Sequence, residues 1–534
     1  MRSNAAEVLV VGAGPVGLAL AAELARHGVG VRIVEARAAP LPFCRAIGVT
    51  PRTLEIYEDM GVARAMIEAG LWLTGTRTQM PGMPPHDAMT DLSDLPYAAL
   101  GVPQGETERV LAAHLARFGG SVERGVRLVS FTQADGGVSV DLDGPRGAEV
   151  AQVRYLVGCD GAHSVVRHLL DIPFEGEAFP MPFMLGDVHL AWPEGAELPR
   201  GVALRALRLR GADEAPDMFI AIPLPERGRY RVSMLAPGDF AAPAGEDVVH
   251  GIQSERLGPA LADIQATADR VMDAPPVVSD LRWSSQYRIS MRLAARYRVG
   301  DVFIAGDAAH IHPPTGGQGM NTGIQDAYNL AWKLALVLKG VAGPAMLDSY
   351  EAERLPEAER VIARTVEESM ALGRERRPPD RLAHTQIKVD YRGSPIIAPA
   401  TEEAGLQPGD RAPDAAGLRR RGVGFPLRLF DLLRGTAHVL LRPVADAGDL
   451  AAIEAEAGLL AGLGLDLRVV AVAPAGADLD DPYGVTLVED AAGSFAASYG
   501  GAAWLVRPDG YVAWRGAAAD ALGPALPRLL GHDA

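Results

Sequence analysis

The stretch EVLVVGAGPVGLALAAELARHGVGVRIVE, residues Glu7–Glu35, decides how the first part of the chain folds. Val8–Val11 is a continuous apolar run, which is typical of a strand buried in a parallel sheet. A glycine-rich turn follows it, then a helical pattern that ends near Gly28, and then a second apolar run at Val31–Val34. This order of strand, helix and strand predicts the first unit of a parallel α/β sheet.

The glycine-rich turn has the pattern Gly-x-Gly-x-x-Gly. Gly12 permits a tight turn, Gly14 lets the backbone approach a pyrophosphate, and Gly17 lets the helix pack closely on the strand. The helix N-terminus offers amide donors and a positive dipole end to the phosphates. Glu35, at the end of the second strand, can accept hydrogen bonds from ribose hydroxyls. These residues predict a dinucleotide site of the Rossmann type, but they do not distinguish NAD from FAD.

A second motif, VFIAGDAAHIHPPTGGQGMN at Val302–Asn321, distinguishes the two cofactors. A strand is expected at Val302–Ala305, and a turn rich in proline and glycine leads from it to a long helix at Met320–Lys339. Asp307 is placed to hold the hydroxyls of a ribityl chain, and the amides of Gly316–Asn321 would face the pyrimidine end of a flavin. Reduced flavin is negative there, so a positive helix end stabilises it. The second motif therefore favours FAD.

A third motif, Asp160-Gly161, stands in YLVGCDGAHSVVR at Tyr155–Arg167. By itself it is equally typical of a turn that follows a strand. In this order the three motifs resemble those of the class A flavoprotein aromatic hydroxylases, which include para-hydroxybenzoate hydroxylase, phenol hydroxylase and the polyketide hydroxylases. The resemblance covers about residues 7–370. It implies a Rossmann-like FAD-binding domain, with FAD as the cofactor and NAD(P)H as the co-substrate.

The resemblance implies a role for each residue that matches the family's motifs. The glycines of the first motif and Glu35 would hold the ADP half of FAD, and Asp160 and Gly161 would serve both FAD and NAD(P)H. His163 and Arg167 fall where family members place residues associated with NAD(P)H. The other implied cofactor contacts are Arg45 near the pyrophosphate, Gln104 and Asp307 at the ribityl chain, and Pro314, Gly317, Gly319, Met320 and Asn321 around the flavin ring.

The same resemblance implies the reaction. NAD(P)H reduces FAD, dioxygen adds at the flavin C4a carbon, and the resulting hydroperoxide transfers oxygen to a phenolic or polyketide aromatic. Pro314 would lie beside C4a and, with Arg45, is expected in the catalytic site. The hydroperoxide must be shielded from water, or it decays to hydrogen peroxide.

The residue that activates the substrate is harder to name from the sequence. A phenol becomes a better nucleophile when a base removes its proton. Tyr230 is the candidate in the sheet region, with His189, Arg205 and Gln286 as alternatives, although each is also typical of a structural role. Methionine and phenylalanine are frequent in the same region, which suits an aromatic pocket and an ordinary core equally well.

The remaining patterns divide the chain into four segments. An FAD-binding domain is expected over residues 1–173, with an inserted segment near 76–100 on the substrate side. Residues 174–285 hold short alternating segments between turn residues, which predicts an antiparallel sheet that forms a substrate domain. Residues 286–395 return to the FAD-binding domain and add a helical linker, and residues 400–534 form a small α/β domain.

The last segment resembles the thioredoxin-like tail of the phenol and polyketide hydroxylases. The resemblance rests on PGDRAPD at Pro408–Asp414 and WLVRPDGYVAWRG at Trp504–Gly516. The segment contains no cysteine and therefore no CxxC pair, which excludes a thiol redox role. A packing role or a homodimer contact is favoured.

Composition narrows the classes of protein further. The chain has 534 residues and a net charge of −16, so it is expected to repel nucleic acid and anionic membranes. The apolar run after Glu7 is broken by glycines, which argues against a signal peptide or a membrane span. Cys44 and Cys159 stand far apart, which excludes a disulfide framework and a cysteine-rich metal site and fits the cytoplasm.

Three other functions share the FAD motifs. A flavin halogenase or reductase is possible on the same domain, but the WxWxIP motif of halogenases is absent from the sequence. A Baeyer–Villiger or epoxidising outcome stays open, because the same flavin chemistry serves each. A non-catalytic FAD-binding protein is the third alternative, and NAD(P)H oxidation stimulated by a substrate would exclude it.

Overall fold

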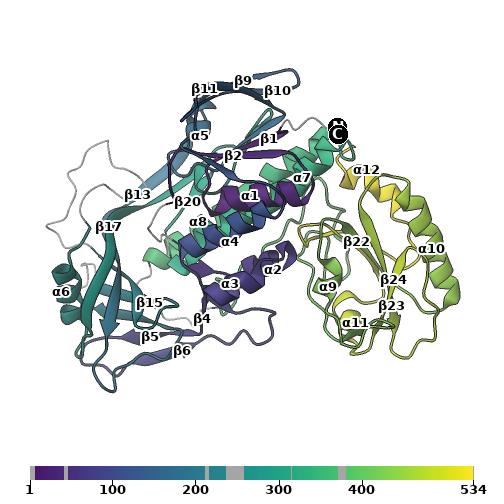
Figure 1. The fold of residues 1–534 in the computed structure, drawn as a ribbon. Helices are drawn as coiled ribbons and strands as arrows, with labels where there is room; N and C mark the ends of the chain where they lie inside the picture. The colour runs from purple at the N-terminus through teal and green to yellow at the C-terminus, as the bar shows by residue number, and fades with distance from the viewer. Residues whose placement is uncertain are drawn as a thin grey trace.

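A computed structural model gives the fold of most of the chain (Figure 1). The residues that it describes are 6–40, 46–210, 216–235, 258–313, 315–370 and 380–532. Within these ranges the strands form two six-stranded sheets, one eight-stranded sheet and two three-stranded sheets. In Figure 1 the first six-stranded sheet lies at the upper centre, the eight-stranded sheet to its left and the second six-stranded sheet to its right.

The central sheet confirms the strand–helix–strand unit at the start of the chain. β1 (Val8–Val11) is parallel both to β2 (Val31–Glu35) and to β12 (Tyr155–Gly158). Every residue of β1 is buried, as expected for an apolar strand that is covered on both faces. The strand order is β18 (Arg298–Val299), β19 (Val302–Ile304), β12, β1, β2 and β8 (Val122–Arg124).

Long helices pack beneath this sheet. α1 (Pro15–Arg26) contacts α4 (Gln104–Ala116) and α7 (Gln318–Leu338), and α7 contacts α8 (Asp348–Met370). Figure 1 shows α1, α4 and α7 side by side. α1 begins with a proline, whose fixed φ suits the first position of a helix. α1 and α7 each begin directly after a glycine turn that the sequence marks as a cofactor motif.

Smaller elements cover the edges of the central domain. The antiparallel meander of β9 (Arg127–Ala134), β10 (Gly137–Gly144) and β11 (Gly147–Val153) was not predicted from the sequence. The other elements are α5 (Val165–Leu169), α2 (Pro51–Met60) and α3 (Ala63–Ala69), with the small sheet of β3 (Gly48–Val49), β7 (Ala99–Gly101) and β4 (Leu71–Leu73).

The eight-stranded sheet confirms a mainly antiparallel layer beside the central domain. Its long strands β13 (Phe174–Ala191) and β17 (Val277–Ala294) pair with each other, and Ala294 belongs to the core of the central domain. β17 therefore runs through residue 285, where the sequence suggested a boundary, because the two units share this strand. The strand order is β20 (His310–Ile311), β17, β13, β16 (Arg229–Leu235), β15 (Asp217–Pro223), β14 (Val202–Arg208), β5 (Gly75–Gln79) and β6 (His86–Met89).

The C-terminal domain is a thioredoxin-like α/β unit with a mixed sheet. β22 (His438–Pro443), β23 (Leu467–Pro474) and β24 (Val485–Asp490) are parallel, and β25 (Ala503–Val506) and β26 (Val512–Gly516) are antiparallel. The remaining elements are β21 (Leu418–Arg419), α9 (Leu429–Leu433), α10 (Ala447–Ala461), α11 (Ser494–Tyr499) and α12 (Leu526–Leu529).

The C-terminal domain shares an apolar core with the central domain. Trp332 and Leu336 of α7, together with Met346, belong to the same buried cluster as the inner side chains of the C-terminal sheet. The domain is therefore packed onto α7. In the part of the chain that the structure describes, no helix combines the length and the apolar character that crossing a membrane requires.

Candidate functional site

The structure brings the three motifs together. β1, β12 and β19 are parallel neighbours, and each motif begins where one of these strands ends. A Cβ atom at Gly12 would overlap the carbonyl oxygen of Cys159, directly before Asp160. A Cβ atom at Gly306 would press on Val16, in the first turn of α1. Ligands of open α/β sheets bind at this carboxyl edge, so the motifs form one candidate site.

The first motif leaves its phosphate-facing end open. Glu35 Oε2 accepts the N–H of Ala13 at 2.9 Å, which fixes the turn against β2. Gly14 is the N-cap of α1 and has φ −73°, and no other described residue comes within 4 Å of its would-be Cβ. No described side chain caps this helix end. Free amides beside open space are what a pyrophosphate requires, so the residues present fit FAD.

Asp160 of the third motif caps α5. Its Oδ2 accepts the N–H groups of Val165 at 2.7 Å and Val166 at 3.2 Å. Its Oδ1 is buried and has no hydrogen-bond partner among the described residues. Burial raises the pKa of this carboxyl group. A buried oxygen that lacks a protein partner is the kind of group that a bound ligand satisfies.

Arg167 connects the third motif to the second. Its Nη1 donates to the carbonyl oxygen of Ala308 at 2.9 Å, and its Nη2 donates to that of Ala162 at 2.7 Å. The guanidinium lies 3.9 Å from the ring centroid of Phe174, and burial lowers its pKa. His163 is exposed beside it. Arg167 thus has a structural role, because it connects the backbone of the third motif to that of the second. The NAD(P)H role of Arg167 and His163 stays a prediction.

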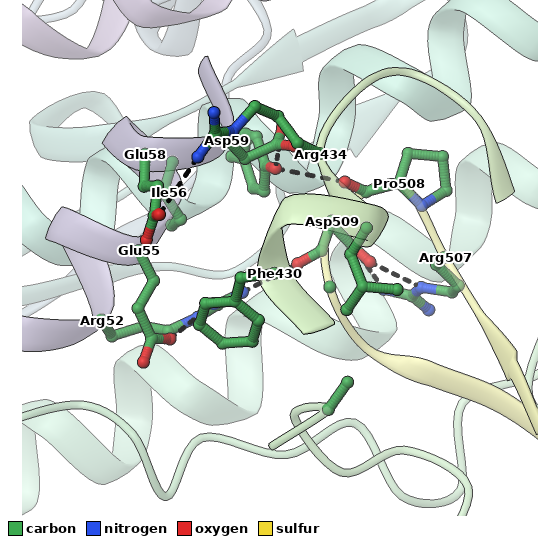
Figure 2. Close-up of a pocket in the computed structure, with 14 residues that line it drawn as sticks. Arg52, Glu55, Ile56, Glu58, Asp59, Phe430, Arg434, Arg507, Pro508 and Asp509 are labelled. Atoms are coloured by element: carbon green, nitrogen blue, oxygen red, sulfur yellow. Dashed lines mark hydrogen bonds and ion pairs between the residues drawn. The ribbon is translucent and has the colours of Figure 1, made fainter. Parts of the chain in front are cut away.

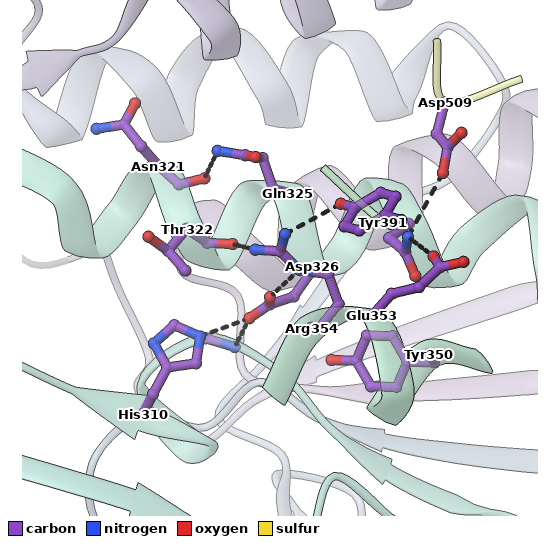
Figure 3. Close-up of polar contacts among 12 residues, drawn as sticks. His310, Asn321, Thr322, Gln325, Asp326, Tyr350, Glu353, Arg354, Tyr391 and Asp509 are labelled. Carbon is purple, nitrogen blue, oxygen red and sulfur yellow. Dashed lines mark hydrogen bonds and ion pairs between the residues drawn. The ribbon is translucent and has the colours of Figure 1, made fainter. Parts of the chain in front are cut away.

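A buried carboxylate fixes the Gly306 turn of the second motif. Asp326 Oδ2 accepts the N–H of Gly306 at 3.0 Å and lies 2.7 Å from His310 Nε2 (Figure 3). Arg354 Nε donates to Asp326 Oδ1 at 2.8 Å. Burial opposes the charge on Asp326, but His310 and Arg354 hold its pKa below the usual value. Asp307 is exposed next to this buried group, on the open side of the turn.

Hydrogen bonds of the Asn321 side chain fix the backbone at the start of α7. Gly316 and Gly317 have φ of 70° and 66°, and no described side chain caps the helix. Asn321 Nδ2 donates to the carbonyl oxygens of Gly48 and Gly317, at 2.9 and 2.7 Å. Asn321 Oδ1 accepts the N–H of Thr50 at 3.0 Å. The Asn321 side chain thus has a structural role, and the contact of this turn's backbone amides with a flavin stays a prediction.

The remaining predicted cofactor contacts fall partly outside the described residues. Gln104 Oε1 accepts the N–H of Ala46 at 3.1 Å, and its Nε2 donates to Glu108 at 2.8 Å. Gln104, the first residue of α4, thus contacts the loop that precedes Gly48. Arg45 and Pro314 lie outside the described residues, so their predicted positions at the flavin are not tested.

One face of the eight-stranded sheet is turned toward the flavin site. Ile47, which precedes Gly48, packs with Ile222 and Trp283 of this sheet and with Leu224, which directly follows β15. Gly48 in turn lies against Gly317, since a Cβ on Gly48 would be 3.9 Å from the Gly317 Cα. The same face carries an apolar cluster made of Phe183, Leu207, Met218, Ile220, Leu235, Met291 and Met80. We call this surface the open face, because no described helix contributes a side chain to its cluster.

Tyr230, the predicted base, is not on the open face. It belongs to the core on the opposite face, which α6 (Leu261–Val271) covers, and its hydroxyl accepts the Trp192 Nε1–H at 3.3 Å. Gln286 is paired with Met184 of the same core, so it shares that face. Among the alternatives, Arg205 is paired with Ile220 of the open face. The structure therefore does not bring Tyr230 to the flavin side.

A separate cleft lies between α2 and the C-terminal domain (Figure 2). Its charged lining groups are paired with each other or with neighbours. Arg52 Nη1 lies 3.0 Å from Glu55 Oε2, and Arg434 Nη2 lies 3.1 Å from Glu58 Oε1. Asp509 Oδ2 likewise lies 2.5 Å from Arg507 Nη2. None of the residues that line the cleft belongs to the three motifs, and among the described residues it carries no free donor set that would mark it as the cofactor site.

Comparison with known proteins agrees with this geometry. Residues 5–365 match the family model described as "FAD binding domain", and residues 406–532 match that of "Aromatic-ring hydroxylase, C-terminal". The chain is 33% identical to 12-dehydrotetracycline 5-monooxygenase/anhydrotetracycline 6-monooxygenase of Streptomyces rimosus, over 99% of both chains. It is 32% identical to rifampicin monooxygenase of Streptomyces venezuelae, over 98% of both.

A solved structure shows the same arrangement of domains. Aklavinone-11 hydroxylase in a ternary complex with FAD and aklavinone is 30% identical, with a TM-score of 0.77, over 99% of this chain and all of the other. FAD is accordingly the cofactor, and NAD(P)H is the co-substrate typical of such enzymes. The chain belongs to the family of FAD-dependent aromatic-ring hydroxylases, the flavin monooxygenases.

Proposed function

We propose that this enzyme hydroxylates a polycyclic phenolic aromatic of the polyketide type, with NAD(P)H and dioxygen. Relatives that match nearly the whole chain are named for tetracycline intermediates and for rifampicin, and the solved relative holds aklavinone. These molecules are larger than a single phenol ring. The match over the C-terminal domain supports the same branch of the family.

The observation that carries the proposal is the apolar open face beside the glycine turn. Phe183, Leu207 and Met218 are at least nine-tenths buried on this face, and further large side chains pack around them. Ligand sites are mostly apolar, with few polar groups to fix orientation. An apolar surface built from five neighbouring strands suits a flat, multi-ring substrate better than a single ring.

The residues of this chain divide the work around FAD, which supplies the oxygen-activating chemistry when bound. The uncapped amides at the start of α1 would hold the pyrophosphate, and the exposed Asp307 would hold the ribityl chain. The turn before α7 would offer its backbone amides to the flavin ring. The open face would orient the aromatic ring and exclude water, which protects a reactive oxygen species from decay.

The first experiment measures NAD(P)H oxidation by the FAD-loaded enzyme with anhydrotetracycline, aklavinone and phenol. We expect the tetracyclic compounds to stimulate oxidation and to gain one ring hydroxyl, with the oxygen derived from labelled dioxygen. Stimulation by phenol alone would overturn the polycyclic assignment. A lactone or an epoxide as the product would replace hydroxylation by a Baeyer–Villiger or epoxidising reaction.

A matched pair of variants locates the substrate. Met218 and Phe219 are neighbours on β15 but lie on opposite faces of the sheet, in the open-face cluster and the α6-side core respectively. We expect Met218→Ala to raise KM for the tetracyclic substrate about tenfold, as loss of a buried apolar contact predicts. Phe219→Leu should change stability and leave KM nearly unaltered. Equal effects on KM would contradict this placement.

Two further expectations concern the protein's surroundings. We propose a homodimer, since a C-terminal domain without cysteine favours a contact role, and sedimentation of the holoenzyme at twice the chain mass would support it. Because the reaction consumes NAD(P)H, the cytoplasm is the compartment that we propose.

A further inference from the structure

The segment Leu382–Gln386, which we call the strap, lies against the flavin site although it leads toward the C-terminal domain. Gln318 Nε2 donates to the carbonyl oxygen of His384 at 3.2 Å and lies 3.4 Å from its Nδ1. The same Nε2 lies 3.3 Å from the carbonyl oxygen of Gly316. A Cβ atom on Gly316 would overlap the His384 ring. The strap therefore touches the glycine turn before α7 directly.

Gln386 makes a second set of contacts and has an unusual backbone. Its φ is 58° and it is 4% exposed. Such a conformation is unfavourable for any residue but glycine, and it persists only where the surroundings hold it in place. Its side-chain oxygen accepts Gln325 Nε2–H at 2.7 Å and the Thr50 hydroxyl at 3.3 Å. Its Nε2 donates to the Thr322 hydroxyl at 3.0 Å.

The strap also reaches α2. The carbonyl oxygen of Thr385 accepts the N–H of Arg52 at 3.1 Å, at the N-terminus of this helix. Thr50, directly before α2, donates its N–H to Asn321 on the first turn of α7. Figure 3 shows Asn321 and Gln325 on that part of α7. One short segment thus connects the glycine turn, the start of α7 and the start of α2.

We propose that the strap is a positioning element for FAD. His384 and Gln386 hold the Gly316–Gln318 turn and the start of α7 in the shape that receives the flavin pyrimidine ring. Fixed amides stabilise charge on a flavin only when their direction is maintained, because an electrostatic field from dipoles depends on their orientation. The strap therefore strengthens FAD binding and raises the reduction potential of the bound flavin. This inference rests on FAD binding and not on the identity of the substrate.

Two substitutions separate positioning from simple packing. His384→Ala removes the ring beside Gly316, and since this side chain is 43% exposed, no core cavity opens. Gln386→Gly removes three hydrogen bonds but relieves the left-handed backbone, so the fold is spared. Each variant should raise the FAD dissociation constant roughly threefold to tenfold, the effect of one or more lost hydrogen bonds. The midpoint potential of the bound flavin should fall in both.

The control is Lys388→Ala, two residues beyond the strap, which removes only an exposed pair with Asp380. It should match the unaltered enzyme in FAD affinity, potential and melting temperature. His384→Asn, whose amide can replace Nδ1, should restore most of the lost affinity. Hydrogen exchange at the Gly316–Asn321 amides of the FAD-loaded protein should rise in His384→Ala and not in the control.

Two results would overturn the proposal. In the first, FAD affinity, potential and hydrogen exchange in His384→Ala and Gln386→Gly equal those of Lys388→Ala. In the second, both variants melt earlier while the flavin properties stay unchanged, which would make the strap only a packing element. Neither result requires the aromatic substrate, so a failure here is distinct from a failure of the proposed hydroxylation.

Discussion

At the scale of single residues, the carboxylate of Asp326 supports the flavin turn from beneath. It accepts the Gly306 amide and pairs with Arg354 in a fully buried setting. We expect Asp326→Asn to lower the free energy of unfolding by about 3–5 kcal/mol, because Arg354 loses a buried counter-charge. Urea denaturation measures this change. An effect as small as that of Glu359→Gln, an exposed carboxylate on α8, would contradict the expectation.

The lowered pKa of His438 predicts how the free energy of unfolding depends on pH. It is buried edge-on against Trp332, and burial, then Arg507, lowers its pKa from 6.5 to about 4. The unfolded state therefore binds a proton more readily, so the stabilising contribution is present above pH 6.5 and is lost as the pH falls toward 4. His438→Leu should reduce the loss of stability that accompanies this fall in pH. The measurement compares urea midpoints at about pH 7 and about pH 5, with the exposed His86→Leu as control.

At the scale of elements, two glycines of the first motif act differently on α1. A Cβ at Gly17 would overlap the carbonyl oxygen of Gly12, whereas described residues leave the space beside Gly14 open. We expect Gly17→Ala to displace α1 and to lower both melting temperature and FAD affinity. Gly14→Ala should keep the melting temperature of the FAD-free protein and lose FAD affinity at least tenfold, because its methyl group takes pyrophosphate space. Calorimetry and flavin titration test both, and equal losses of stability would contradict the distinction.

Local patterns predicted the elements that carry the glycine motifs, while pairing between distant segments escaped them. α1 and β1 follow from an apolar run and a glycine turn in one stretch of sequence. The β11 strand was missed because it is mostly exposed and lacks an alternating apolar pattern. Tyr230, the predicted base, lies on the α6 side of its sheet, because the face that a strand residue takes depends on register, which a single sequence does not reveal. Asp326 was missed because its partners are distant in sequence.

At the scale of the whole molecule, a buried charge network joins the C-terminal domain to the long helices. Arg507 lies 2.7 Å from Glu353 and 2.5 Å from Asp509, and Glu353 also pairs with Lys333 at 2.7 Å. Each of these side chains is at most 1% exposed. We expect Arg507→Met to destabilise the protein by about 3–5 kcal/mol, because the carboxylates lose a buried partner.

Thermal unfolding followed by calorimetry measures this effect. The C-terminal domain should then melt before the FAD-binding domain, and the single transition should broaden or split. Arg64→Met removes a pair whose arginine is 92% exposed and should leave the melting temperature nearly unchanged, because water screens such a pair. A sharp single transition with an unchanged midpoint in Arg507→Met would show that the network does not hold the domains together.

The strands β13 and β17 extend from the core of the flavin domain into the sheet that bears the open face, and their pairing shifts register between Ala178 and Pro182 and between Asp187 and His189. Movement between these two regions would have to bend both strands together, because each strand belongs to both regions. Under the proposed function, engineering this enzyme for a new aromatic compound therefore means substituting the side chains of β14, β15 and β16 on the open face, one at a time. Loop grafting between the regions offers little, because the connection between them is made by two strands that both regions share.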